Sequence, residues 1–193
     1  MPAISLPTPN RNFGGNTGGP INHRTSFNFD IQRRQIQNNA ITNAFYVDPT
    51  SFAVNHIQTS LVTPSYNTTI TPRIDYALSD KNTLTVRFEE RLNSADNQGL
   101  GGRALPPGFS VPDFPNALAY SNSGNGQNLM VTETSILTTH LVNETRFQFQ
   151  RNSTQTPGNL LPGISVQNEF TSGGNGIGAR RTDKAFRNTN TAR

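Results

Sequence analysis

Residues able to do acid–base or metal chemistry are present, but their spacing suits neither. His23, His56 and His140 lie far apart, with no His, Asp or Glu cluster at metal-ligand spacing. Glu89 and Glu90 are adjacent and would point to opposite faces of a strand, which is wrong for a carboxylate pair acting on one bond. The chain has no cysteine, which excludes a disulfide, a thiolate metal site and a cysteine nucleophile. We therefore expect no enzyme, no metal and no cofactor.

Two glycine-rich stretches are the next candidates for a binding function. Neither "FGGNTGGP" (Phe13–Pro20) nor "SGGNGIG" (Ser172–Gly178) is followed by the Lys-Ser/Thr pair of a phosphate-binding loop. Neither lies in the strand-to-helix setting of a dinucleotide fingerprint. Because glycine permits tight turns and close backbone approach, we interpret both stretches as structural.

Charged residues occur in their clearest order within Ile70–Arg91, "ITPRIDYALSDKNTLTVRFEER". Two runs of about nine residues, each with an apolar residue at every second position, flank a short polar turn. This alternation predicts two antiparallel strands with one apolar face and one charged face. The apolar face would carry Ile74, Tyr76, Leu78, Leu84, Val86 and Phe88, and the charged face Arg73, Asp75, Arg87 and Glu89.

The charges also predict how these two strands pair. With Leu78 opposite Leu84, opposite charges face each other across the strands, which stabilises by roughly 0.2–1 kcal/mol per pair. A shift by two residues would set Arg73 opposite Arg87 in one direction, and two carboxylates opposite each other in the other direction. The predicted pairs are Leu78–Leu84, Tyr76–Val86, Ile74–Phe88, Asp75–Arg87 and Arg73–Glu89, around a turn at Ser79–Thr83.

A second hairpin is predicted in residues 128–151, "NLMVTETSILTTHLVNETRFQFQR", with its turn at "TTHL". Pairing Glu133 with Arg146 would bring opposite charges together. That register places Leu129 and Val131 on the charged face. The apolar face would then carry Met130, Thr132, Thr134, Ile136, Phe147 and Phe149, and the charged face Glu144 and Arg146.

Short turns and long connections alternate along the chain. A glycine-rich strand, a turn at 22–24 and a run with Phe27, Phe29 and Ile31 on one face precede these hairpins, giving about six strands in all. Loops longer than about 15 residues, such as 38–67 and 92–126, are uncommon in compact soluble domains. Outer-membrane barrels combine short periplasmic turns with long extracellular loops. We therefore predict an all-β fold of antiparallel up-and-down strands, an incomplete outer-membrane β-barrel with long extracellular loops.

Composition indicates what the two faces touch. Only 32% of the residues are hydrophobic, which is poor for a packed soluble core. The predicted strands also approach the 9–11 residues that a tilted membrane strand needs. We expect the apolar face, with Ile74, Tyr76, Leu78, Leu84, Val86, Phe88, Phe147 and Phe149, to meet lipid. We expect Arg73, Asp75, Arg87, Glu89, Glu144 and Arg146 to line the lumen as solvated, paired charges with no role in binding a ligand.

The basic end of the chain is a separate feature. The segment from Gly178, "GARRTDKAFRNTNTAR", has five basic residues and one acidic residue, which accounts for the whole net charge of +4. Aromatic residues that could stack on bases are almost absent from it, so we expect no nucleic-acid partner. Residues 179–193 are predicted to be a disordered basic tail behind a barrel domain at 10–178.

Four phrases, in this order, resemble the barrel of Oar-like TonB-dependent outer-membrane transporters. "NRNFGGNTGGPINHRTSFNFDIQ" resembles the glycine-rich stretch and aromatic strand that open that barrel. "TPRIDYALSDKNTLTVRFE" resembles its Arg-x-Asp and Leu-Ser-x-Lys-x-Thr-Leu hairpin. "VNETRFQFQRN" and "PGISVQNEFTSGGNGIG" are similar to the strand and loop that follow, and the resemblance covers residues 10–178.

The resemblance implies a structural role in nutrient uptake in the cell outer membrane. In that family a barrel of about 22 strands surrounds a plug, and an inner-membrane complex relays energy through TonB. The sequence shows no signal peptide, plug or TonB-contacting segment. We therefore expect a fragment that is surrounded by outer-membrane lipid and reaches the TonB complex only through parts outside this sequence. The residues name no particular imported ligand.

An open sheet of this kind would have consequences in isolation. Unpaired edges and an exposed apolar band favour aggregation, so we expect the isolated chain neither to transport nor to remain a soluble monomer. The alternative to a barrel is a soluble secreted β-sandwich that binds glycans. In that case Tyr76 and Phe88 would lie in the core, and Phe45, Tyr46 and Tyr120 would form the contact platform.

Overall fold

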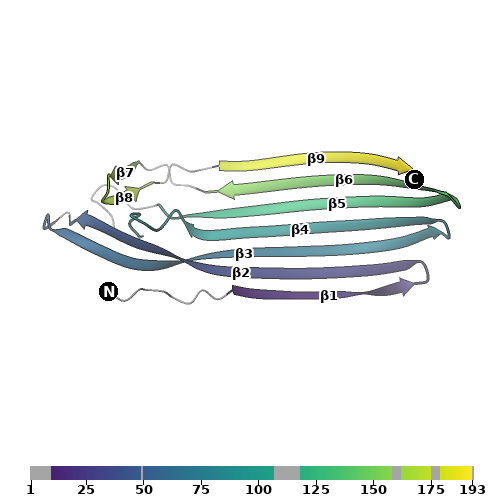
Figure 1. Cartoon of the computed structure of the whole chain (residues 1–193), viewed down its shortest axis with the longest axis horizontal. Helices are drawn as coiled ribbons and strands as arrows, with labels where there is room; N and C mark the ends of the chain where they lie inside the picture. The colour runs from purple at the N-terminus through teal and green to yellow at the C-terminus, as the bar shows by residue number, and fades with distance from the viewer. Residues whose placement is uncertain (1–9, 49, 107–117, 158–161, 175–178, 193) are drawn as a thin grey trace.

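One long antiparallel sheet dominates the chain, with a small hairpin at one end (Figure 1). The structure is a computed structural model that describes residues 10–48, 50–106, 118–157, 162–174 and 179–192. The sheet has seven strands in the order β1-β2-β3-β4-β5-β6-β9 and is not closed, and β7 and β8 form the hairpin. The predicted all-β, up-and-down architecture is confirmed. The strands are β1 (Asn10–Asn22), β2 (Thr25–Val47), β3 (Val54–Ser79), β4 (Asn82–Gln98), β5 (Tyr120–Thr138), β6 (Leu141–Thr156), β7 (Gly163–Val166), β8 (Phe170–Gly173) and β9 (Ala179–Ala192).

The two ends of the sheet differ in how the strands are connected (Figure 1). At one end, which we call the turn end, two-residue turns at His23–Arg24, Asp80–Lys81 and Thr139–His140 join consecutive strands. At the other, the loop end, the connections are residues 48–53, 99–119 and 157–178. The last of these contains β7 and β8. Among the described residues, no helix is long and apolar enough to cross a membrane.

β2 and β3 are longer than the sequence predicts. Their pairing runs without a break from Thr25 opposite Tyr76 to Val47 opposite Val54. Most of residues 38–67, which we expected to be a loop, is therefore strand. Asn, Gln and Thr occur on both faces of this extension, so the apolar–polar alternation that marks the hairpin at Ile70–Arg91 is weak here.

The pairing of β3 with β4 differs from the predicted register by two residues. Ile74 lies opposite Val86, and Arg73 lies opposite Arg87. The predicted pairs of Tyr76 with Val86 and of Arg73 with Glu89 are therefore wrong. A two-residue turn at Asp80–Lys81 closes the hairpin more tightly than the five-residue turn we expected. The cost of facing like charges is offset because each arginine has a carboxylate partner on its own strand.

The pairing of β5 with β6 differs from the predicted register by one residue. Val131 lies opposite Phe147 and Leu129 opposite Phe149, whereas Glu133 lies opposite Thr145. A shift by one residue exchanges the two faces of a strand. Leu129 and Val131 therefore share the face of the two phenylalanines, which gathers four apolar side chains where the predicted register gave a mixed face. The predicted turn at "TTHL" is present, with Thr138 opposite Leu141.

The basic end of the chain forms β9 rather than the disordered tail that we expected. β9 pairs with β6 from Ala179 opposite Thr156 to Ala192 opposite Asn143. Phe186 lies opposite Phe149, and their ring centroids are 4.8 Å apart. The high charge and the short alternation of this segment hid its strand character.

The turns at the turn end are staggered along the strands. Thr25, beside the first turn, pairs with Tyr76, three residues before β3 ends at Ser79. Asn82, beside the second turn, pairs with Ser135, three residues before β5 ends at Thr138. Each offset of three residues is about 10 Å along the strand. Neighbouring turns are two strands apart, which is also about 10 Å across the sheet. A line drawn through the turns is therefore not perpendicular to the strands. The strands are inclined by about 45° to the direction perpendicular to that line, which is similar to the 35–45° tilt of strands in membrane barrels.

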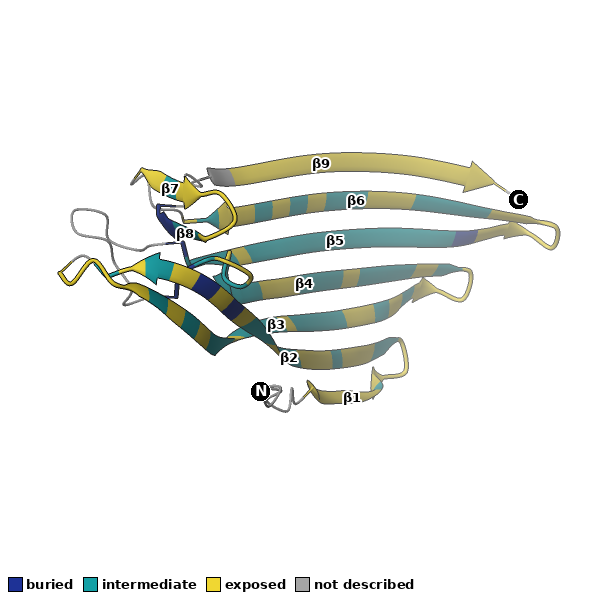
Figure 2. Cartoon of the chain, turned by 60° about the vertical axis from the view of Figure 1, so that its left-hand side comes forward, coloured by how far each residue is buried: buried dark blue, intermediate teal, exposed yellow. Residues whose placement is uncertain are grey.

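The most buried residues lie at the loop end, several of them in the last part of β2 and in β8 (Figure 2). Here the connection after β4 crosses the end of β2: the Asn43 amide donates to the Gly102 carbonyl (2.7 Å), and the Thr42 hydroxyl donates to the Ala104 carbonyl (2.9 Å). The Leu105 amide donates to Thr171 of β8 (2.9 Å). We call this packed region the loop cluster. It buries Thr42, Ala44, Leu105 and Ser172.

A polar turn closes the extended β2–β3 hairpin. The Asp48 carboxylate accepts hydrogen bonds from the backbone amides of Ser51 (2.8 Å) and Thr50 (2.9 Å). These hydrogen bonds, the one from Ser51 first, hold the pKa of Asp48 below its ordinary value of 3.8. The turn presents Phe52, which has a φ of 56° and is 80% exposed.

The β3–β4 register predicts which engineered cysteines form a disulfide. The chain has no native cysteine, so the doubly substituted chain has no competing thiol. The pair Ile74→Cys with Val86→Cys should oxidise readily, since directly opposite residues bring their Cβ atoms within about 5.5 Å. The control pair Ile74→Cys with Phe88→Cys is diagonal and should stay reduced. Faster disulfide formation in the control, measured by gel mobility under mild oxidation, would support the charge-matched register instead.

The Asp48 turn predicts a local dependence on pH. Because folding lowers the pKa of Asp48, its carboxylate stabilises the turn above pH 3.8, and this contribution is lost as pH falls through the lowered pKa. In detergent, a carboxyl NMR titration of Asp48 should have its midpoint below 3.8, and the Ser51 amide signal should shift with it. In Asp48→Asn the Ser51 amide should no longer follow this transition. A midpoint at or above 3.8 would contradict the turn geometry.

Candidate functional site

The six residues predicted to face the lumen share one face of the sheet, which we call the polar face. Side chains alternate along a strand, so a residue shares its face with its partner on the next strand. Arg73 lies opposite Arg87, and the row of partners that begins at Asp75 reaches Arg146 on β6. The same pairing places all six together: Arg73, Asp75, Arg87, Glu89, Glu144 and Arg146.

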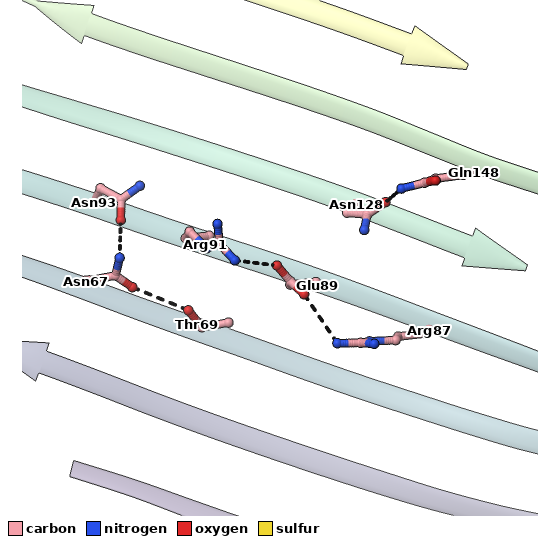
Figure 3. Close-up of polar contacts among 8 residues, drawn as sticks. All are labelled: Asn67, Thr69, Arg87, Glu89, Arg91, Asn93, Asn128 and Gln148. Carbon is pink, nitrogen blue, oxygen red and sulfur yellow. Dashed lines mark hydrogen bonds and ion pairs between the residues drawn. The ribbon is translucent and has the colours of Figure 1, made fainter. Parts of the chain in front are cut away.

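Ion pairs on the polar face run along the strands rather than between them. On β4, Glu89 binds Arg91 at 2.9 Å and Arg87 at 3.4 Å (Figure 3). The same spacing of two residues joins Arg73 to Asp75 (2.8 Å), Arg146 to Glu144 (2.8 Å) and Arg181 to Asp183 (2.9 Å). All ion pairs found among the described residues lie on this face. Exposed pairs contribute about 0–1 kcal/mol each, so they neutralise charge more than they hold the sheet together.

Amide side chains form cross-strand contacts on the same face. The Asn67 amide nitrogen donates to Asn93 at 2.7 Å across β3 and β4, and the Thr69 hydroxyl donates to Asn67 at 3.4 Å (Figure 3). Across β5 and β6, the Gln148 amide donates to Asn128 at 2.9 Å. These contacts satisfy polar groups that lie among the charged side chains of this face.

The hollows on the polar face include two that differ in size and lining. The larger, of about 1060 Å³, lies toward the loop end and spans β1 to β6. Its polar lining is mostly uncharged, with Asn12, Asn16, Gln32, Asn67, Asn93 and Asn122. The smaller, of about 560 Å³, contains Asp30, Arg73, Asp75 and Arg87. The Thr85 hydroxyl of β4 also donates to Asp75 at 2.7 Å.

The opposite face of the sheet, which we call the apolar face, carries continuous rows of hydrophobic side chains. The first row runs through Phe27, Ile74, Val86, Val131 and Phe147. The second includes Phe29 and Pro72 on β2 and β3, and Phe88, Leu129, Phe149 and Phe186 on β4 to β9. Seven of the eight residues predicted to meet lipid lie in these rows or in the next one, where Tyr76 faces Leu84. The eighth, Leu78, lies at the register shift beside the turn.

Two tyrosines flank these hydrophobic rows on β3. Tyr76 lies near the turn end and Tyr66 toward the loop end, and both share the face of Ile74. Their separation of ten residues is about 34 Å along the strand, or about 24 Å after the 45° tilt. Arg33 lies over the Tyr66 ring, 5.5 Å from its centroid. An apolar band about 25 Å tall between aromatic girdles is typical of outer-membrane barrels.

The histidines do not form a site. His23 and His140 lie in two different two-residue turns, and His56 stacks on Phe45 with ring centroids 4.6 Å apart. In the part of the chain that the structure describes, no three His, Cys, Asp or Glu side chains are grouped as metal ligands.

Sequence reasoning missed the larger hollow and the loop cluster. The hollow depends on amides from several strands, and the register that gathers them is not visible in any one strand. One signal of the polar face was present in the sequence. In "NTTITPR" a polar residue occupies every second position, and Asn67, Thr69 and Thr71 all belong to the polar face. The loop cluster joins segments more than 60 residues apart, such as Thr42 and Ala104, for which no local pattern exists.

Comparison with known proteins agrees with this geometry. The sequence matches the family described as Outer membrane beta barrel domain over residues 36–192, which extends from within β2 to the end of β9. The match includes the segment that we expected to be a tail. No curated protein and no solved structure matches the chain. Because the match covers most of the sequence, the chain belongs to the outer membrane beta-barrel domain family.

Proposed function

We propose that this chain forms part of the wall of a TonB-dependent outer-membrane transporter of the Oar-like kind, which takes up nutrients. The observation that carries the proposal is a single-layered sheet with continuous apolar rows on one face and charged, amide-rich rows on the other. In this arrangement the apolar face meets lipid and the polar face lines an aqueous lumen. The four phrases that resemble the Oar-like barrel support the finer assignment.

The connections give the orientation. Outer-membrane barrels have short periplasmic turns and longer extracellular loops, so the turn end would face the periplasm and the loop end the exterior. Thr42 and Ala44 are separated from Asp30 and Arg34 by even numbers of residues on β2, so all four lie on the polar face. The loop cluster therefore covers the lumen side of β2. Ligand arriving from outside would meet the loop cluster first and the larger hollow beneath it.

The sheet edges support a larger wall. Six antiparallel steps separate β1 from β9, so these two edge strands run in the same direction. Neighbours in an up-and-down barrel are antiparallel, and closure therefore needs at least one further strand between β1 and β9. Such strands would also satisfy the edge backbone groups, which lipid does not tolerate unpaired.

The soluble sandwich is less well supported. A β-sandwich needs a second sheet about 10 Å from the apolar face of the first. Among the described residues the second sheet has only four-residue strands, β7 and β8, and its contacts are with the loop end of β2 and its neighbouring connection.

Lipid contact predicts different costs for the same substitution on the two faces. Val86→Arg would place a charge in the middle of the apolar band, among Ile74 and Val131, and should destabilise the protein in lipid vesicles by about 2–4 kcal/mol. The control, Thr71→Arg, adds the same side chain at the same depth on the polar face, opposite Asp30, and should change stability by less than about 1 kcal/mol. Urea unfolding in vesicles measures both. Equal costs would contradict the assignment of the faces.

Transport itself predicts a change in what cells remove from their medium. A strain lacking the gene should leave at least one solute in the medium that the parent strain depletes. Because TonB-linked uptake needs the inner-membrane proton gradient, a protonophore should stop depletion of that solute by the parent. Mass spectrometry of spent medium measures both effects. Identical depletion profiles in parent and deletion strains would contradict a role in uptake.

A further inference from the structure

Two cations lie opposite each other on the apolar face without a carboxylate partner. Arg151 of β6 pairs with Lys184 of β9, in the row next to the one that contains Phe149 and Phe186. Within the described ranges, neither cation makes an ion pair, whereas Arg73, Arg87 and Arg146 of the polar face do. The Nε of Arg151 is buried and has no hydrogen-bond partner there.

The nearest carboxylate on this row is occupied by neutral donors. Glu90 of β4 accepts hydrogen bonds from the amides of Asn125 (3.1 Å) and Gln127 (3.4 Å). Gln127 lies between Glu90 and Arg151 in the row. Like charges directly opposite each other destabilise a strand pair. For Arg73 and Arg87 a carboxylate on the same strand offsets this repulsion, and in the described part of the chain the Arg151–Lys184 pair has no such carboxylate.

An apolar surface adjoins the two cations on the side of the turn end. Phe149 and Phe186 are directly opposite each other, with ring centroids 4.8 Å apart, and Phe186 is 71% exposed. The arrangement is therefore amphipathic along the strand, with two aromatic rings followed by two cations.

The stagger of the turns gives the height of this pair in the membrane. The row through Tyr66 reaches Gln155 on β6, three strands away. The turns are offset by three residues for every two strands. Over three strands, the position at the same height as Tyr66 therefore moves by about four or five residues toward the turn end. On β6 this position is Arg151. Arg151 is therefore level with Tyr66 at the outer limit of the apolar band, and Lys184 lies slightly further out.

We propose that Arg151 and Lys184 bind the phosphate of an anionic outer-leaflet lipid whose acyl chain lies over Phe149 and Phe186. A phosphate between the two cations offsets their repulsion and accepts charge-assisted hydrogen bonds from the terminal nitrogens of the Arg151 guanidinium and from the Lys184 ammonium. A lipid fits better than free phosphate because the cations continue directly into the apolar band. The proposal rests on the assignment of the apolar face to lipid.

The test compares lipids that differ only in phosphate. The full chain is reconstituted in phosphatidylcholine vesicles that contain either diphosphoryl lipid A or dephosphorylated lipid A, and lipid retained after detergent extraction is measured by mass spectrometry. The wild-type chain should retain the phosphorylated lipid about thirtyfold better, which corresponds to about 2 kcal/mol for two cationic contacts. The dephosphorylated lipid should be retained weakly.

Matched variants locate the effect. Arg151→Gln with Lys184→Gln should abolish the preference for the phosphorylated lipid, and Lys184→Gln alone, on an exposed side chain, should reduce it without affecting folding. Arg187→Gln with Lys81→Gln removes the same charges from the polar face and a turn, and should leave the preference unchanged. Equal loss in both double variants would overturn the proposal in favour of general charge attraction.

Two further outcomes separate the lipid site from the barrel. If inorganic phosphate displaces the lipid at low concentration, the site is one for a free anion and the proposal is wrong. If the wild-type chain floats with the vesicles but shows no preference between the lipids, the lipid site is wrong and the barrel wall stands. If the wild-type chain does not associate with vesicles, both are wrong.

Discussion

Backbone hydrogen bonding between neighbouring strands determines where every side chain of this sheet lies. Lipid offers no hydrogen bonds, so each strand that crosses it must pair its amides and carbonyls with neighbouring strands. The seven-stranded sheet does so over nearly the full length of each strand. Once pairing is fixed, the two-residue period of side chains decides which residues share the apolar face and which share the polar face. The faces therefore follow from register, and a shift of one residue would exchange them.

The sequence predicts the fold well because alternation and turn chemistry are local. The hairpin at Ile70–Arg91 shows both, and its division into an apolar and a charged face agrees with the structure. Its register was wrong because cross-strand charge pairing contributes little compared with the geometry of a tight turn. The charges instead pair within a strand, as Arg73 does with Asp75 at 2.8 Å. Where opposite charges can pair within one strand, the charge pattern is therefore a weak predictor of the register between strands.

Features that depend on several strands were beyond sequence reasoning. The larger hollow collects Asn67, Asn93 and Asn122 from three strands, and each looks like an ordinary polar strand residue in isolation. The loop cluster buries Ala44 and Leu105 through contacts between distant connections. β9 was missed because its charges suggested a solvated tail, although its backbone extends the sheet. In each case non-local pairing decides the structure, and composition gives no sign of it.

The proposed wall requires that adjacent residues of one strand meet lipid and water in turn. Nitroxide labels at Met130→Cys and Val131→Cys in lipid vesicles test it most directly, since these neighbours lie on opposite faces of β5. We expect the label at 131 to collide mainly with oxygen dissolved in lipid, and the label at 130 to collide mainly with a water-soluble nickel complex. The same accessibility at both positions, or the reverse assignment, would contradict it.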